Sequence, residues 1–285
     1  MRIILIASDS MGTRSMATFV ETRDLKVIID PAVALGPKRN GLPPHPLEIE
    51  KMEEDWREIR EYAARSDMVV ITHYHYDHYN PAEIDILKGK KLFVKHPTEN
   101  INLSQKKRAE YFLSKLQQEK VHVEYCDNKN FKKGSTEIIF SKAVFHGTSP
   151  KLGYVVEVFI KEGRQSFLFS SDVEGPGIKE QAEFILDCNP KITYIDGPMT
   201  YMLGYRYSGA SLQASIKNLL KIVENTQVNT LILDHHLLRD LRWRDYMNEV
   251  SEACRQKGCE FLSAALYSGK EELMLEARRK ILYEK

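Results

Sequence analysis

A histidine cluster directly after an apolar run is the feature that most restricts how this 285-residue chain can fold. The run MVVIT at 68–72 has the composition of a buried strand, and residues 71–80 read ITHYHYDHYN. Four candidate ligands therefore stand where a rigid strand gives way to a loop: His73, His75, Asp77 and His78. A fold that uses them together must hold the mouth of this strand around one point.

The spacing within the cluster suits metal binding. His73 and His75 are two residues apart, so in extended backbone their rings leave the same side and can bind one ion. Asp77 and His78 follow in the turn and can face a second ion. Imidazole and carboxylate ligands favour zinc, iron or manganese, and no cysteine lies nearby for a structural zinc site. The alternative is a polar turn that happens to be rich in histidine.

Further His and Asp residues follow other apolar runs. His146 comes after KAVF, Asp172 after FLFSS, and His235 and His236 after LILD. Each stands just past a predicted strand, which is the position of the first cluster. This repeated placement favours a metal site over a chance turn.

These residues resemble a known family. HYHYDH fits the H-x-H-x-D-H pattern of the metallo-β-lactamase superfamily, and the later His146, Asp172 and His235 come in that family's order. VIIDP at 27–31 looks like the superfamily's second-strand aspartate turn. The stretches GLPPHP, SSDVEGP and LDHHLLRD are similar to those of metal-dependent hydrolases of this superfamily from archaea and thermophilic bacteria.

The resemblance implies an α+β fold, a four-layer αβ/βα sandwich of two mixed β-sheets flanked by helices, with the site at one edge. It also implies two divalent metal ions, zinc in the first place and manganese or iron as alternatives. The implied first ligand set is His73, His75 and His146, the second is Asp77, His78 and His235, and Asp172 bridges the two. Either His235 or His236 can be the last ligand, and the family's spacing favours His235.

The pattern along the chain agrees with mixed sheets covered by helices. We expect one domain over 1–285, built from two loosely related halves at about 1–150 and 151–285, and a long irregular loop at 31–46. The predicted strands are 3–7, 27–29, 68–72, 91–94, 121–125, 138–140, 154–159, 166–169, 192–195 and 230–233. The predicted helices are 46–64, part of 99–120, 210–224, 246–257 and 270–283.

The implied chemistry is hydrolysis by hydroxide bound to two metal ions. Asp77 can steer the hydroxide, and His236 is the first candidate for protonating the leaving group, with Asp234 beside it. Asp196, after TYI, can orient a histidine or simply form a turn. We expect a metal-dependent hydrolase of an anionic ester, such as a phosphodiester or RNA. The alternatives are a lactonase or thioesterase of the same fold, and a metal-binding protein without enzymatic activity.

Substrate contacts are suggested by two loops and one arginine. SMGTRS and GYRYSG combine glycine, hydroxyl groups and arginine, a combination that is also common in ordinary loops and solvated surfaces. We expect Tyr74 and Tyr76 to alternate away from the histidines and to pack the loop. The candidate contacts are Ser10, Thr13, Arg14, Tyr205, Arg206 and Arg239.

Composition limits the setting of the protein. Lys and Arg total 41 against 40 Asp and Glu, which argues against a nucleic-acid coat but leaves room for a local basic rim. Four scattered cysteines indicate free thiols in a reducing cytosol. Without a leader or a membrane-length apolar run, we expect a cytoplasmic protein that acts on a small-molecule or nucleic-acid substrate, with no membrane partner. The oligomeric state stays open.

Overall fold

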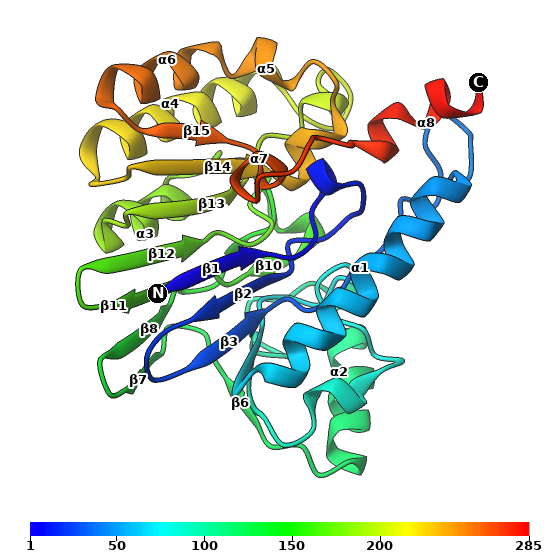
Figure 1. Ribbon diagram of the computed structural model, residues 1–285, viewed down its shortest axis with the longest axis vertical. Coiled ribbons are helices and arrows are strands. Elements are labelled where there is room, and N and C mark those ends of the chain that lie inside the picture. The colour runs from blue at the N-terminus through cyan, green and yellow to red at the C-terminus, as the bar shows by residue number, and fades with distance from the viewer. Residues whose placement is uncertain (285) are drawn as a thin grey trace.

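Two mixed β-sheets lie face to face in the computed structural model, which describes residues 1–284 (Figure 1). In the first sheet, two antiparallel pairings precede three parallel ones. Its order is β1 (Arg2–Leu5), β2 (Thr18–Glu21), β3 (Lys26–Ile29), β4 (Met68–Ile71), β5 (Lys91–Val94) and β6 (Val123–Tyr125).

The second sheet has four parallel strands followed by an antiparallel part. Its order is β15 (Glu260–Leu262), β14 (Thr230–Asp234), β13 (Ile192–Asp196), β12 (Gln165–Phe169), β11 (Val158–Glu162), β8 (Thr136–Phe140) and β7 (Asn130–Lys133). A separate hairpin-like pair joins β9 (Val144–Phe145) to β10 (Tyr154–Val155).

Helices cover the outer face of each sheet, α1 and α2 on the first and α3, α4 and α6 on the second (Figure 1). Their bounds are α1 (Pro46–Arg65), α2 (Leu103–Gln118), α3 (Lys179–Cys188), α4 (Gly209–Asn225) and α6 (Asn248–Lys257), with the shorter α5 (Trp243–Tyr246), α7 (Ala264–Tyr267) and α8 (Leu275–Tyr283). Short 3-10 helices span Asp9–Met11, Ile84–Leu87, Pro150–Leu152, Thr200–Met202 and His235–Arg239.

Strand β4 shows why the layers form. All four of its residues are buried, because alternate side chains leave opposite faces of a strand and both faces are covered. Val70 packs between the sheets with Phe93 and Phe167, whereas Val69 and Ile71 pack against the helical layer. The predicted α+β sandwich with four layers is confirmed.

The predicted elements agree with the structure in most places, but the strand at 154–159 is wrong. The chain leaves β10 after Val155, and the Val156 amide donates to the Thr72 carbonyl before β11 begins at Val158 in the other sheet. The helix expected over 270–283 starts only at Leu275. The short or polar elements β2, β7, β15, α3 and α7 lie outside the predicted ranges, because short or polar segments give weak apolar patterns. None of the helices in the described part of the chain has the length and apolar character that crossing a membrane requires.

Glu157, between β10 and β11, is a buried acid that gives a stability prediction. Its side chain is fully buried, and neither carboxyl oxygen finds a hydrogen-bond partner among the described residues. Burial raises the pKa of Glu157 well above its usual range. Burial, as the largest cause, also raises the pKa of the Cys188 thiol to about 12, so this thiol stays protonated.

We expect Glu157→Gln to stabilise the protein at neutral pH. The folded wild type keeps a proton that the unfolded chain releases above about pH 4.3, so its free energy of unfolding falls as pH rises through that value. Glutamine has no such proton, and the gain should be about 1–3 kcal/mol at pH 8. Urea unfolding at pH 4 and pH 8 measures it, with the exposed Glu110→Gln as control. An equal difference at both pH values would contradict this explanation.

Candidate metal centre

The candidate ligands meet where strands of both sheets end. His73, Asp77 and their neighbours follow β4, His146 follows β9, Asp172 follows β12 and His235 follows β14. β4 belongs to the parallel part of the first sheet and β14 to the parallel part of the second. Parallel strands end at the same edge of their sheet, which is where α/β folds place their binding sites.

The structure brings all seven predicted ligands together in two groups that share Asp172. In each group, the ligand atoms lie within 4.8 Å of one another. The first group is His73, His75, His146 and Asp172, and the second is Asp77, His78, His235 and Asp172.

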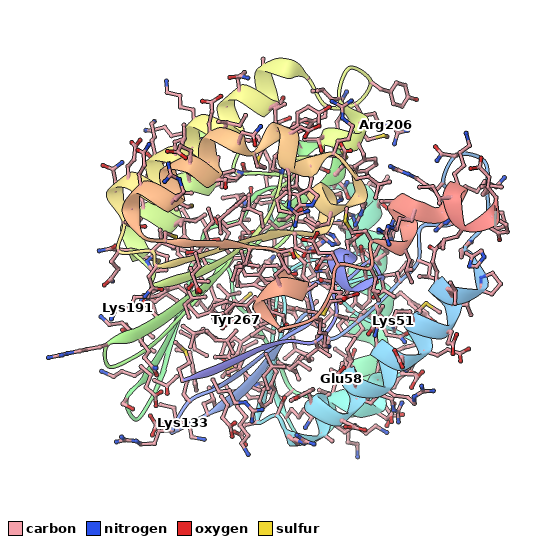
Figure 2. All side chains as sticks on the ribbon, turned by 45° about the horizontal axis from the view of Figure 1, so that its top comes forward. Lys51, Glu58, Lys133, Lys191, Arg206 and Tyr267 are labelled. Atoms are coloured by element: carbon pink, nitrogen blue, oxygen red, sulfur yellow. The ribbon has the colours of Figure 1, made fainter. Side chains whose placement is uncertain are left out.

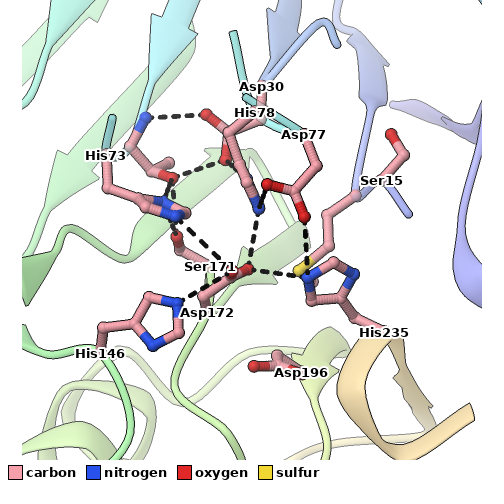
Figure 3. Close-up of polar contacts among 12 residues, drawn as sticks. Ser15, Asp30, His73, Asp77, His78, His146, Ser171, Asp172, Asp196 and His235 are labelled. Atoms are coloured by element: carbon pink, nitrogen blue, oxygen red, sulfur yellow. Dashed lines mark hydrogen bonds and ion pairs between the residues drawn. The ribbon is translucent and has the colours of Figure 1, made fainter. Parts of the chain in front are cut away.

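Asp172 lies at the centre, and its two oxygens face different groups (Figure 3). Oδ2 is 3.5 Å from His73 Nε2 and 3.2 Å from His146 Nε2. Oδ1 is 3.0 Å from His78 Nε2 and 3.4 Å from His235 Nε2. One carboxylate is therefore placed to serve two cation sites at once.

Carboxylates orient the histidines by contacting the opposite ring nitrogen. Asp30 Oδ2 lies 2.8 Å from His78 Nδ1, and Asp9 Oδ2 lies 2.7 Å from His235 Nδ1. Glu174 Oε1 lies 3.4 Å from His146 Nδ1. For His73 the same place is taken by hydroxyl groups, with Ser171 Oγ and Thr72 Oγ1 each 3.3 Å from Nδ1. Each of these rings thus turns Nε2 toward Asp172, as outer partners do for metal-binding histidines.

The electrostatics of the site fit bound cations. Burial alone would lower the pKa of His78, but Asp172 and Asp30 raise it to about 10. Burial would likewise lower the pKa of His146, and contacts with Asp172 and Glu174 raise it to about 10. Burial and the charge of His78 instead lower the pKa of His73 to about 4, so the carboxylates favour positive charge at His78 and His146 but not at every ring. Within the described residues, His73 Nε2, His78 Nε2 and Asp172 Oδ1 are buried without a hydrogen-bond partner, so the donor set suits divalent ions.

The backbone around the site is held in an uncommon conformation. Asp30, Ser171, Glu174 and His235 all have φ between 49° and 57°, in the left-handed region that non-glycine residues rarely adopt. Such conformations persist where the surrounding structure imposes them, and they cluster at functional sites. Gly147 is required here, because a Cβ on it would meet Glu174 Oε2 and displace this partner of His146.

His235 and His236 take different places. His235 joins the second group through Nε2, whereas His236 belongs to neither group. His236 Nδ1 lies 3.0 Å from Asp196 Oδ2, and its ring lines the cavity, so Nε2 is the nitrogen left to face a substrate. Burial lowers the pKa of His236 and raises the pKa of Asp196, because neither charge is favoured there alone.

A cavity of about 870 Å³ opens over the two groups. Arg14, Tyr205, Arg206 and Arg239 line it, as do Asp77 and His236. Ser10 and Thr13 do not belong to the lining. The Ser10 amide donates to Asp234 and the Thr13 hydroxyl donates to Asp55, both within the buried interior. Arg14 is held by Glu276 and Arg239 by Asp9, so these two arginines are already paired.

The expectation that both tyrosines of the cluster pack the loop is half right. Tyr74 is buried, and its hydroxyl donates to the Lys95 carbonyl. Tyr76 instead lines the cavity with 50% of its surface exposed. The sequence reasoning also missed Asp9 and Glu174, although each is a carboxylate just past a strand or beside a ligand.

Solved structures with the same arrangement define the class of fold. An isothiocyanate hydrolase from Delia radicum gut bacteria has a TM-score of 0.57 at 15% identity, over 89% of this chain and 94% of that one. Zinc-bound PqqB from Methylobacterium extorquens has 0.52 at 11%, over 92% and 97%. CmlA, a diiron β-hydroxylase from Streptomyces venezuelae, has 0.52 at 13%, over 87% of this chain and 51% of CmlA, so the match spans about half of that protein. The chain has the metallo-β-lactamase fold, which confirms the resemblance found in its sequence.

Sequence relatives then give the family. A UPF0282 protein of Korarchaeum cryptofilum is 55% identical over 285 residues, covering 100% of this chain and 95% of the relative. A UPF0282 protein of Sulfurisphaera tokodaii is 44% identical over 289 residues, covering 100% and 94%. No protein-family model matches the sequence. The chain belongs to the UPF0282 protein family.

Proposed function

We propose that this protein is a metal-dependent hydrolase of an anionic ester, most directly a phosphodiester. The observation that carries the proposal is the division of the Asp172 carboxylate between two groups of ligand atoms on the floor of the cavity. His73, His75 and His146 would hold one divalent ion, Asp77, His78 and His235 the other, and Asp172 both. When bound, two such ions supply Lewis acidity, which makes water more acidic and draws charge from a substrate oxygen. Zinc is the ion that the histidine-rich set favours first.

The protein's own groups supply orientation and proton transfer. Asp77 lines the cavity beside the second group, 3.8 Å from His235 Nε2, and is placed to accept a hydrogen bond from the attacking water. As the water oxygen bonds to phosphorus, the water gives up a proton to His236 Nε2, which is unprotonated while Nδ1 donates to Asp196. The imidazolium then passes this proton to the ester oxygen as it departs. Asp196 fixes the His236 ring by accepting from Nδ1, and is itself held by the backbone amides of Glu174 and His236.

The walls of the cavity favour an anionic substrate. Arg108, Lys151 and Arg206 line it, and none of them has a carboxylate within ion-pair distance in the part of the chain that the structure describes. A lactonase or thioesterase pocket for a neutral acyl group would be poor in such cations.

We expect purified wild-type protein to contain near two equivalents of zinc, manganese or iron and to hydrolyse bis-p-nitrophenyl phosphate. Elemental analysis measures the metal, and the same preparation is assayed on RNA, a lactone and a thioester. Preference for the neutral esters would replace the phosphodiester proposal by the lactonase or thioesterase alternative. Full metal loading without turnover of any substrate would favour a non-enzymatic protein.

A further inference from the structure

Two tyrosine–arginine pairs line the cavity, one from each half of the chain. Arg108 lies over the Tyr76 ring at 4.8 Å, and Arg206 over the Tyr205 ring at 5.5 Å. Both tyrosines are unusually exposed for large aromatic side chains, at 50% and 78%. All four residues line the cavity that holds the candidate ligands.

The elements that carry the pairs are well fixed. Arg108 is on α2, and its guanidinium donates to the Tyr74 carbonyl. Lys151, which adds a third free cation on this side, is held to α2 by a bond from Asn102 to its carbonyl. On the other side, the amides of Tyr205 and Arg206 both donate to the Met202 carbonyl, which shapes the turn before α4. Figure 2 shows Arg206 at the edge of the molecule, beside the start of this helix.

Arg108 and Arg206 differ from the other arginines of the cavity because no carboxylate among the described residues pairs with them. Arg14 and Arg239 also line the cavity, but carboxylates already neutralise them. Arg108 and Arg206 meet only tyrosine rings and backbone oxygen among the described residues. Each pair therefore offers a free positive charge for a phosphate and, directly beside it, a flat ring or guanidinium plane.

We propose that the substrate is a single-stranded oligonucleotide whose bases stack on Tyr76 and Tyr205 on either side of the cleaved phosphodiester. This inference rests on the proposed function and adds to it the class of ester. Bases stack on exposed aromatic faces regardless of sequence, and alternating cations follow the phosphate backbone. A small phosphate ester would leave both rings without a role, whereas a strand that crosses the cavity uses both pairs.

Binding measured without turnover tests the inference. Fluorescence anisotropy of labelled oligouridylate and oligothymidylate, each about eight nucleotides long, is followed in the presence of chelator. We expect Tyr76→Ala and Tyr205→Ala each to weaken binding roughly 5- to 150-fold, as loss of one stacked base does. Arg206→Ala should reduce the slope of log Kd against log salt concentration by about one. The RNA and DNA probes show which sugar is preferred.

The chain offers a matched control. Tyr111 is 51% exposed and has Lys115 Nζ 4.9 Å from its ring, but it lies outside the cavity lining. Tyr111→Ala should bind like wild type. If wild type binds neither oligonucleotide, or if the Tyr76 and Tyr205 variants bind as well as wild type, the inference is overturned. The metal-dependent hydrolysis of bis-p-nitrophenyl phosphate is assayed separately, so its failure is distinguishable from failure of oligonucleotide binding.

Discussion

Replacing Asp172 with alanine will abolish loading of both metal sites and reduce hydrolysis by more than about 100-fold, exceeding the 10- to 100-fold typical of outer-partner mutations. The reason is the geometry of the carboxylate. Its Oδ2 serves the group around His73 and His146, and its Oδ1 serves the group around His78 and His235. No other described residue belongs to both four-residue groups. Elemental analysis and the bis-p-nitrophenyl phosphate assay measure the two effects.

The Asp172 experiment needs a variant that separates folding from metal binding. Asp172→Asn preserves the shape of the side chain but removes the negative charge, and Asp187→Ala removes an exposed aspartate from α3. Added zinc should raise the Tm of wild type and of the Asp187 variant, because an ion that binds only the folded state stabilises it. Zinc should raise the Tm of the two Asp172 variants by no more than a small fraction of the wild-type increase. If the Asp172 variants retain two equivalents of metal and full activity, Asp172 is not the ligand that the two groups share.

The grouping of the candidate ligands could be predicted because it depends on local order and strand ends. His73, His75, Asp77 and His78 are neighbours in sequence, so a single turn after β4 brings them together. His146, Asp172 and His235 are distant in sequence, but each follows an apolar run. Strand ends at one edge of a sandwich meet in space, and the family order supplied the pairing that spacing alone left open.

The partners that orient the histidines could not be read in this way. Asp9 reaches His235 across 226 positions of sequence only because the 3-10 helix Asp9–Met11 packs beside the one at His235–Arg239. The same segment shows why Ser10 is not at the cavity. Its amide donates to Asp234 and its hydroxyl accepts from the Ala265 amide, so Ser10 supports the segment that carries the last ligand instead of contacting a substrate.

The directions of the Tyr74 and Tyr76 side chains could not be predicted from the sequence either. Alternation from His73 and His75 predicts that Tyr74 and Tyr76 point away together, which holds only while the backbone is extended. The strand ends at Ile71, and the His78 amide already closes a turn onto the His75 carbonyl. Tyr76 therefore turns to the cavity while Tyr74 stays in the core. A loop pattern one residue past a strand end does not fix the face of a side chain.

The second large effect concerns proton delivery by His236. We expect His236→Gln to slow cleavage of a dinucleotide, whose alkoxide leaving group needs a proton, by about 10²- to 10⁴-fold. The same variant should slow bis-p-nitrophenyl phosphate far less, because p-nitrophenolate departs without a proton. Metal content should stay at the wild-type value, since His236 belongs to neither ligand group.

Two further variants separate this role of His236 from a purely structural one. Asp196→Asn should show the same dependence on the leaving group, since Asp196 Oδ2 lies 3.0 Å from His236 Nδ1 and fixes which nitrogen faces the cavity. The exposed His122→Gln should behave as wild type. A uniform loss on both substrates would mean that His236 only shapes the cavity. In that case the proton must come from water or from another side chain in the lining, and Tyr205 and Arg206 would keep their binding role unchanged.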